Sequence, residues 1–230
     1  MKIGILQTGH APDALIGASG DYPQMFETLL AGHGFTFTTY DIEAGEMPCD
    51  IHDCDGWLIT GSRHGVYEAH PWIAPLEELI RTIWAAKIPL VGICFGHQII
   101  AQALGGRVEK FAGGWAVGPT EYLIDGEALT LNAWHQDQVV ALPRDARAVG
   151  ACTSGHCSTG ALIYGDTIYT VQPHPEFAND FVGGLIETRA KGVVPAPLLE
   201  AATDKLQAPT DGARLAAHIA EFFLKGGQNG

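Results

Sequence analysis

The chain has 230 residues, and 47% of them are hydrophobic, which is enough to bury a sizeable core in one domain. Its formal net charge of −13 argues against a nucleic-acid partner and against an anionic membrane surface, because Lys and Arg carry most phosphate binding. No stretch approaches the ~20 consecutive apolar residues of a membrane span, and residues 1–7 are too short for a signal-peptide core, so we expect a cytoplasmic protein.

The first part of the chain alternates between strand-like and helical patterns. Alternation of this kind favours an α/β fold, with a mostly parallel central sheet flanked by helices. The strand-like runs lie at residues 2–7, 36–40, 56–60 and 89–93, and the clearest helical patterns lie at residues 22–31 and 72–86.

A cysteine lies where the fourth strand meets the next helix. The apolar run 88–91 leads into the heptapeptide 92–98 (Gly-Ile-Cys-Phe-Gly-His-Gln), and apolar side chains then recur on one helix face at 99–104. Gly-x-Cys-x-Gly between a strand and a helix is typical of a nucleophile elbow, because glycines permit the tight turn. The nearby helix N-terminus favours the thiolate form of Cys94. The alternative is a buried, inert cysteine at an ordinary connection.

The pattern changes after this helix. We expect a small antiparallel excursion, after which the chain returns to the central sheet. The short strand candidates of the excursion lie at residues 105–110, 115–117, 120–124, 129–132 and 138–141, and the two returning strands lie at 159–164 and 169–172.

A histidine and a glutamate follow the last strand candidate, in the sequence Pro-His-Pro-Glu-Phe at residues 173–177. A cysteine nucleophile needs a base to take its proton, and the base needs a third group to fix its tautomer. His174 and Glu176 supply both at one strand end, although this tripeptide alone also fits a plain loop. His97 is closer to Cys94 in sequence, but we expect its ring to point away from the thiol, as an exposed or packing histidine.

The C-terminal part of the chain has a different character. The Pro-Ala-Pro sequence at 195–197 breaks the α/β pattern, and amphipathic helical patterns follow at 199–206 and 213–224. We therefore predict an α/β domain at residues 1–194 and a helical extension at residues 195–230, packed on the same domain.

Gly-x-Cys-x-Gly-x-Gln followed at a distance by His-Pro-Glu resembles the signature of class I (triad) glutamine amidotransferase domains, over residues 3–191. The resemblance implies a flavodoxin-like α/β catalytic domain with the triad Cys94, His174 and Glu176. Such a triad hydrolyses the side-chain amide of glutamine through a γ-glutamyl thioester. The resemblance also implies an oxyanion hole formed by the backbone N–H groups of Gly61 and Phe95, which would stabilise the oxyanion by about 3 kcal/mol each.

The same resemblance implies three substrate-binding residues. Gln98 matches a glutamine that lies beside the substrate, and His135 and Asp137 match residues near its amino-acid end. The alternative for His135 and Asp137 is a turn that joins two antiparallel strands. Arg63 has the chemistry to pair with a substrate carboxylate, but we expect it to be a surface arginine on a mobile loop.

The cysteines raise the question of a metal ion. Two pairs have the spacing Cys-x4-Cys with a histidine inside each pair, which makes a structural zinc site an alternative. The spacing is loose and no knuckle turn is evident, so we expect free thiols, no metal and no cofactor. The residues concerned are Cys49, His52 and Cys54 in the first pair, and Cys152, His156 and Cys157 in the second.

Three functions remain open. The overall pattern, including residues 20–26 (Gly-Asp-Tyr-Pro-Gln-Met-Phe) after the first strand, looks most like stand-alone amidotransferase-like proteins, a set that includes γ-glutamyl peptidases. We therefore expect hydrolysis or transfer at the γ-glutamyl amide bond of glutamine or of a γ-glutamyl amine or peptide. The first alternative is a glutaminase subunit that supplies ammonia to a synthetase partner in trans, because residues 195–230 are too few for a synthetase domain. The second is a non-catalytic sensing or binding module.

Overall fold

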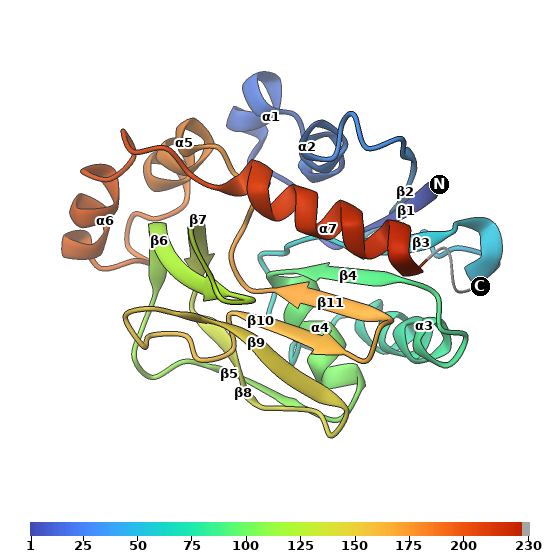
Figure 1. Cartoon of the computed structure of the whole chain (residues 1–230). Helices are drawn as coiled ribbons and strands as arrows, with labels where there is room; N and C mark the ends of the chain where they lie inside the picture. The colour runs from blue at the N-terminus through green and yellow to red at the C-terminus, as the bar shows by residue number, and fades with distance from the viewer. Residues whose placement is uncertain (227–230) are drawn as a thin grey trace.

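The computed structural model describes residues 1–226, and its centre is a nine-stranded sheet with the order β2-β1-β3-β4-β11-β10-β9-β6-β7 (Figure 1). Residues 227–230, the end of the predicted extension, lie outside the described part of the chain. The strands of this sheet are β1 (Lys2–Gln7), β2 (Thr36–Asp41), β3 (Gly56–Ile59), β4 (Leu90–Ile93), β6 (Ala116–Ile124), β7 (Glu127–His135), β9 (Ala146–Cys152), β10 (Ala161–Tyr164) and β11 (Ile168–Val171).

The five strands from β2 to β11 in this order run parallel to one another. Strands β3, β4 and β11 are short and every residue in them is buried, as expected where helices cover both faces of a sheet. Cys94 follows β4 and His174 follows β11, and these two strands are direct neighbours. The topology therefore brings the two motifs of the sequence to the same edge of the sheet.

The other half of the sheet is antiparallel. The α/β fold with flanking helices is confirmed, but the sheet is mixed, because most of the expected excursion continues the central sheet. Apart from it stands a two-stranded sheet of β5 (Arg107–Lys110) and β8 (Asp137–Ala141). Predicted strands 115–117 and 120–124 form one strand, β6. Strand β9 was not predicted, because exposed side chains such as that of Arg147 interrupt its apolar pattern.

Helices cover both faces of the sheet, with α7 along one face and α3 and α4 on the other (Figure 1). Side chains from α3 and α4 pack with Trp57 and Leu90 in one apolar cluster, whereas α2 and α7 pack with Leu58 and Val91 in a second. Within residues 1–226, no helix combines the length and apolarity needed to cross a bilayer. The helices are α1 (Asp13–Ser19), α2 (Tyr22–Leu29), α3 (Ile73–Ala85), α4 (Phe95–Ala103), α5 (Asn179–Thr188), α6 (Ala196–Thr203), α7 (Gly212–Gly226) and the 3₁₀ turn Ile51–Asp53.

Helix α7 of the C-terminal segment packs against the sheet. Its apolar face contributes Leu215, Ile219 and Phe223 to the cluster shared with β1 and β3. Just before the helix, the carboxylate of Asp211 accepts the backbone N–H of Thr130 in β7 (2.8 Å), and the N–H of Asp211 donates to the carbonyl of Thr130 (2.7 Å). Hydrogen bonds therefore hold the start of α7 in place, and burial of its apolar face holds the rest of the helix against the sheet.

The junction between β4 and α4 depends on two glycines. Cys94 has φ 54° and ψ −101°, a region that non-glycine residues seldom adopt. A Cβ on Gly96 would lie 2.4 Å from the carbonyl oxygen of Ile59 in β3, and a Cβ on Gly92 would lie 2.6 Å from the backbone of Gly96. Because both positions lack a Cβ, α4 can begin directly against the sheet, with the side chain of Cys94 at its edge.

Gly96→Ala is expected to lower the free energy of unfolding by about 3 kcal/mol, because the added methyl group meets the rigid backbone of β3. Gly17→Ala is the matched control, since Gly17 lies in α1 with no atom within 4 Å of an added Cβ. The control should keep or raise stability by about 0.5–1 kcal/mol through helix propensity. Urea unfolding of both variants measures the difference, and equal effects would contradict the packing argument.

Candidate active site

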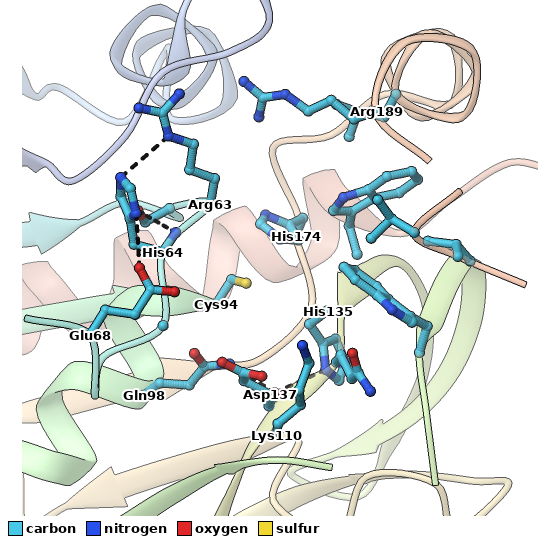
Figure 2. A pocket seen from close by; sticks show the side chains of 18 of the residues that line it. Arg63, His64, Glu68, Cys94, Gln98, Lys110, His135, Asp137, His174 and Arg189 are labelled. Carbon is cyan, nitrogen blue, oxygen red and sulfur yellow. Dashed lines mark hydrogen bonds and ion pairs between the residues drawn. The ribbon is translucent and has the colours of Figure 1, made fainter. Parts of the chain in front are cut away.

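A pocket opens at the carboxyl ends of the parallel strands, with a cavity of about 250 Å³ (Figure 2). Ligand sites of open α/β sheets commonly lie in this place. Its walls come from the loop after β3, the start of β8, and α5 with the segment that follows. The predicted site residues that line the cavity are Cys94, Gln98, His135, Asp137 and His174.

Cys94 is the N-cap residue of α4 and is only 6% exposed. Its backbone N–H donates to the carbonyl of Val171 (2.9 Å), which ties the elbow to the strand that leads to His174. Phe95 is the first residue of α4, and the first N–H groups of a helix have no acceptor within the helix. The positive end of α4 and its first backbone N–H groups therefore lie beside the sulfur.

Gly61 lies beside both Cys94 and His174. A Cβ added to Gly61 would lie 3.0 Å from Cε1 of His174 and 3.9 Å from Cβ of Cys94. The Gly61 carbonyl accepts hydrogen bonds from the hydroxyl groups of Thr8 (3.2 Å) and Thr60 (3.1 Å), both of which are buried. These bonds fix the orientation of the peptide groups at the end of β3, next to the sulfur.

Three contacts hold His174 in place, two through its ring and one through its backbone. Its Nδ1 lies 2.7 Å from Oε1 of Glu176, and both side chains are buried. The ring stacks on Phe177 with a centroid distance of 3.9 Å, and the backbone N–H of His174 donates to the carbonyl of Asn132 (2.8 Å). Its Nε2 has no hydrogen-bond partner among the described residues. Figure 2 shows the ring beside Cys94.

The two histidines of the pocket have opposite electrostatic properties. Burial alone would lower the pKa of His174, but the charges of the Cys94 thiolate and the Glu176 carboxylate outweigh burial, so that this pKa is raised. Burial and the positive charge of His174 lower the pKa of His135 to about 3. The pocket therefore holds one imidazole that favours the charged form and one that stays neutral.

Asn132, which the sequence analysis missed, anchors the His-Pro-Glu loop. Its buried side-chain amide donates to the carbonyl of Phe177 (2.9 Å) and to Oδ1 of Asn179 (3.0 Å), while its backbone carbonyl receives the N–H of His174. Asn179 in turn donates to the carbonyl of Leu206 (2.8 Å), in the segment that precedes α7. The only sequence signal is a polar residue between the apolar residues Leu131 and Ala133.

The three residues predicted to bind substrate are held in different ways. The amide nitrogen of Gln98 donates to the carbonyl of Asp137 (2.9 Å) and to Oε1 of Gln172 (3.1 Å), which leaves its own Oε1 for other partners. The Asp137 carboxylate accepts the hydroxyl of Tyr67 (2.9 Å), and burial raises the pKa of Asp137. The Nε2 of His135 is buried without a partner among the described residues.

Two cationic side chains that the sequence analysis did not single out also line the pocket. Figure 2 shows Lys110 near Asp137 and Arg189 on the opposite side, beyond His174. The half-buried Arg189 donates to the carbonyl of His10 (3.2 Å), but the arginine ion pairs found within residues 1–226 are made by other arginines. The chain has 26 acidic residues and only 13 Lys and Arg residues. Even so, the Arg189 guanidinium has no carboxylate partner among the residues described.

The remaining candidates lie outside the site or at its margin. The exposed guanidinium of Arg63 pairs with Glu43 (2.9 Å), as expected of a surface arginine. His97 is fully buried, and its Nδ1 bonds to the hydroxyl of Thr170 (2.8 Å), so it is a packing histidine and not an exposed one. All five cysteines are free thiols.

Glu176→Gln is expected to lower the pKa of His174, because the amide keeps an acceptor for Nδ1–H but removes a negative charge that favours imidazolium. An NMR titration of the His174 ring in both proteins measures the shift. Glu121→Gln, at an exposed position on β6, is the control and should leave this pKa unchanged. An unchanged or raised pKa in Glu176→Gln would contradict the coupling of the two side chains.

Comparison with known proteins identifies a family that this chain matches. The profile of the family "Glutamine amidotransferase class-I" matches residues 27–183, more than half of the chain. Gamma-glutamyl peptidase 2 of Arabidopsis thaliana is 27% identical over 222 residues, which cover 90% of this chain and 89% of that protein. One subunit of the glutamine-hydrolysing GMP synthase of Halobacterium salinarum is 34% identical over 144 residues, which cover 57% of this chain and 71% of that relative.

Solved structures share the fold. A glutamine amidotransferase from Methylobacillus flagellatus superposes with a TM-score of 0.76 at 22% identity and covers 98% of this chain and 94% of its own. A glutamine amidotransferase from Thermotoga maritima gives a TM-score of 0.71 at 22% identity, with 99% of each chain covered. The resemblance predicted from the two motifs is confirmed. The chain belongs to the class I glutamine amidotransferase family.

Proposed function

We propose that the protein is a self-sufficient γ-glutamyl hydrolase, which cleaves the γ-glutamyl amide bond of a γ-glutamyl amine or peptide through a thioester on Cys94. The observation that carries this proposal is the convergence of Cys94, the His174–Glu176 pair and Gly61 beside one pocket, which Cys94 and His174 line. The 27% identity to a γ-glutamyl peptidase over most of the chain supports the substrate class.

The first half-reaction forms the thioester. The Cys94 thiolate attacks the γ-carbonyl carbon of the substrate, and a C–S bond forms. Backbone N–H groups of Phe95 and Gly61 donate hydrogen bonds to the developing oxyanion, each contributing about 3 kcal/mol of stabilisation. His174 is protonated at neutral pH because its pKa is raised, so it donates the Nε2 proton to the amine as the C–N bond breaks. The free amine then leaves.

The second half-reaction releases glutamate. The neutral imidazole of His174 takes a proton from water, and the oxygen of that water attacks the thioester carbonyl. The C–S bond breaks, the thiolate of Cys94 departs and His174 keeps the proton, which restores the starting ion pair. Because the pKa of His135 is lowered to about 3, this second imidazole stays neutral and does not compete as an acid.

The glutamyl end of the substrate lies on the Asp137 side of the pocket. Burial raises the pKa of the Asp137 carboxyl. The positive charge of a ligand ammonium group beside this carboxyl lowers the same pKa and so favours the carboxylate form. Lys110 on the same side suits the α-carboxylate. The Oε1 of Gln98 and the Nε2 of His135, which have no partner within residues 1–226, add one acceptor and one further polar contact.

The leaving amine lies on the His174 side, because His174 must reach its nitrogen. The wall on this side contains the apolar side chains of Leu185 and Val194 and the positively charged side chain of Arg189. A guanidinium without a carboxylate partner recognises a carboxylate through charge-assisted hydrogen bonds. We therefore assign the leaving group as an amino acid or peptide, whose carboxylate Arg189 binds, in preference to ammonia.

A second candidate function is a glutaminase that passes ammonia to a separate synthetase. The 34% identity to one subunit of a GMP synthase favours it. Such a protein should show weak glutaminase activity when isolated and a marked rise when its synthetase is added. Rapid turnover of γ-glutamyl dipeptides by the isolated protein, with glutamine a poor substrate, would exclude this dependence.

Cys94→Ala is expected to abolish the release of free amine and glutamate from γ-glutamyl dipeptides, with the thermal midpoint essentially unchanged. Mass spectrometry of acid-quenched wild-type protein should detect a glutamyl adduct that is absent from the variant. Cys49→Ala, which removes an exposed thiol, is the control and should retain activity. Turnover by Cys94→Ala would refute the nucleophile, and a folded but inactive wild type would favour a partner-dependent or non-catalytic protein.

Arg189→Gln is expected to raise KM for γ-glutamyl-leucine roughly tenfold or more, the cost of one charge-assisted hydrogen bond. It should leave KM for γ-glutamyl-isopentylamide unchanged, because that amide differs only by the missing carboxylate. Arg63→Gln is the matched control, since Arg63 lines the same pocket but already pairs with Glu43. Equal losses on both substrates would contradict carboxylate recognition by Arg189.

A further inference from the structure

The loop between β3 and α3 brings together three side chains that the proposed hydrolysis does not use. The Nδ1 of His64 lies 3.2 Å from Oε2 of Glu68, and the Nε2 of His70 lies 2.8 Å from the same oxygen. One ligand atom from each of the three residues lies within 4.8 Å of the others. Figure 2 shows His64 and Glu68 at the rim of the pocket, on the side of Cys94 away from His135.

Aromatic packing holds the two rings in place. The ring of His70 stacks on Trp72, with centroids 5.7 Å apart and planes at 12°, and the rings of His64 and His70 are 4.0 Å apart. Trp72 is buried and packs against Phe95 at 5.6 Å. Side chains that converge on one point and are fixed by packing are what a metal site requires.

A second carboxylate supports His64 from behind. The Nε2 of His64 lies 3.3 Å from Oε1 of Glu43, the oxygen that also accepts a hydrogen bond from Arg63. A metal-binding histidine usually presents its other ring N–H to such a carboxylate. The Nε–H of Arg63 donates to the same ring nitrogen (3.3 Å). A metal ion on Nδ1 requires the ring proton to sit on Nε2, so metal binding gives up this bond and keeps the contact with Glu43. Two carboxylates and one guanidinium leave a net negative charge here, which favours a cation.

We propose that His64, Glu68 and His70 form a binding site for a divalent transition metal of the zinc class, at the rim of the pocket. Two imidazole nitrogens and one carboxylate oxygen are donors that suit Zn²⁺. Tetrahedral coordination at ~2.1 Å places donor atoms about 3.4 Å apart, so the 3.2 and 2.8 Å separations here need to widen by about 0.2 and 0.6 Å when the ion binds. The fourth position then belongs to water or to a ligand in the pocket. The hydrolysis mechanism does not need this ion.

The Cys-x4-Cys pairs are the competing metal ligands in this chain. Within residues 1–226, the cluster of His64, Glu68 and His70 is the one group of three His, Cys, Asp or Glu side chains whose ligand atoms converge within 4.8 Å. Neither Cys-x4-Cys pair with its intervening histidine does so. These pairs therefore provide controls for the assignment.

The test uses full-length Cys94→Ala protein, because a thiolate beside His174 would itself bind Zn²⁺. Calorimetric titration with Zn²⁺ alone should give one saturable equivalent. His70→Ala and His64→Ala in this background should each weaken Zn²⁺ binding at least tenfold, and Glu43→Gln should weaken it about tenfold through its contact with His64. His52→Ala, within the first Cys-x4-Cys pair, should leave the affinity unchanged. Circular dichroism of the metal-free variants checks that each is folded.

Three results would overturn the site. The first is the absence of saturable binding below millimolar Zn²⁺. The second is an affinity that neither His70→Ala nor His64→Ala changes. The third is a thiolate charge-transfer band in the absorption spectrum of the Co²⁺ complex, which would assign the ion to cysteine. If His64→Ala does not fold, Glu68→Gln and His70→Ala decide the question, since both side chains are more exposed than His64.

Discussion

The close approach of α4 to the sheet is the constraint on which the rest of the site depends. With no space for a Cβ at Gly92 or Gly96, the chain must turn sharply, and Cys94 takes a backbone conformation that costs of order 1–3 kcal/mol. The buried parallel strands hold that strain in place. Because β11 is the strand next to β4, the same packing that bends the elbow also places His174 beside the sulfur.

Charge is distributed in the pocket in a way that the net charge of the chain does not suggest. The protein carries −13 overall, yet Arg189 and Lys110 lie on opposite sides of its cavity. Between them, buried Glu176 stabilises the charged form of His174, whereas burial without a carboxylate partner keeps His135 neutral. Identical imidazoles therefore have different protonation states, because only His174 has the Cys94 thiolate and the Glu176 carboxylate as neighbours.

The parts of this protein that could be predicted from sequence are those encoded locally. The elbow around Cys94 and the His174–Glu176 pair are short motifs next to apolar strands, so their place at strand ends followed from pattern alone. Asn132 and Arg189 could not be found in this way, because their partners are 45 residues or more away in sequence. The antiparallel half of the sheet was underestimated because β9, which pairs with both β10 and β6, has no clear apolar pattern.

The hydrogen-bond path from Asn132 through Asn179 to the carbonyl of Leu206 reaches beyond the region that defines the family. The family profile ends at residue 183, whereas the loop that carries His174 is tied, through this path, to the chain before α7. The region that the family profile matches and the set of residues that fixes the geometry of the base are thus different in extent. Sequence divergence in the C-terminal segment can therefore retune the position of His174 while every motif residue stays the same.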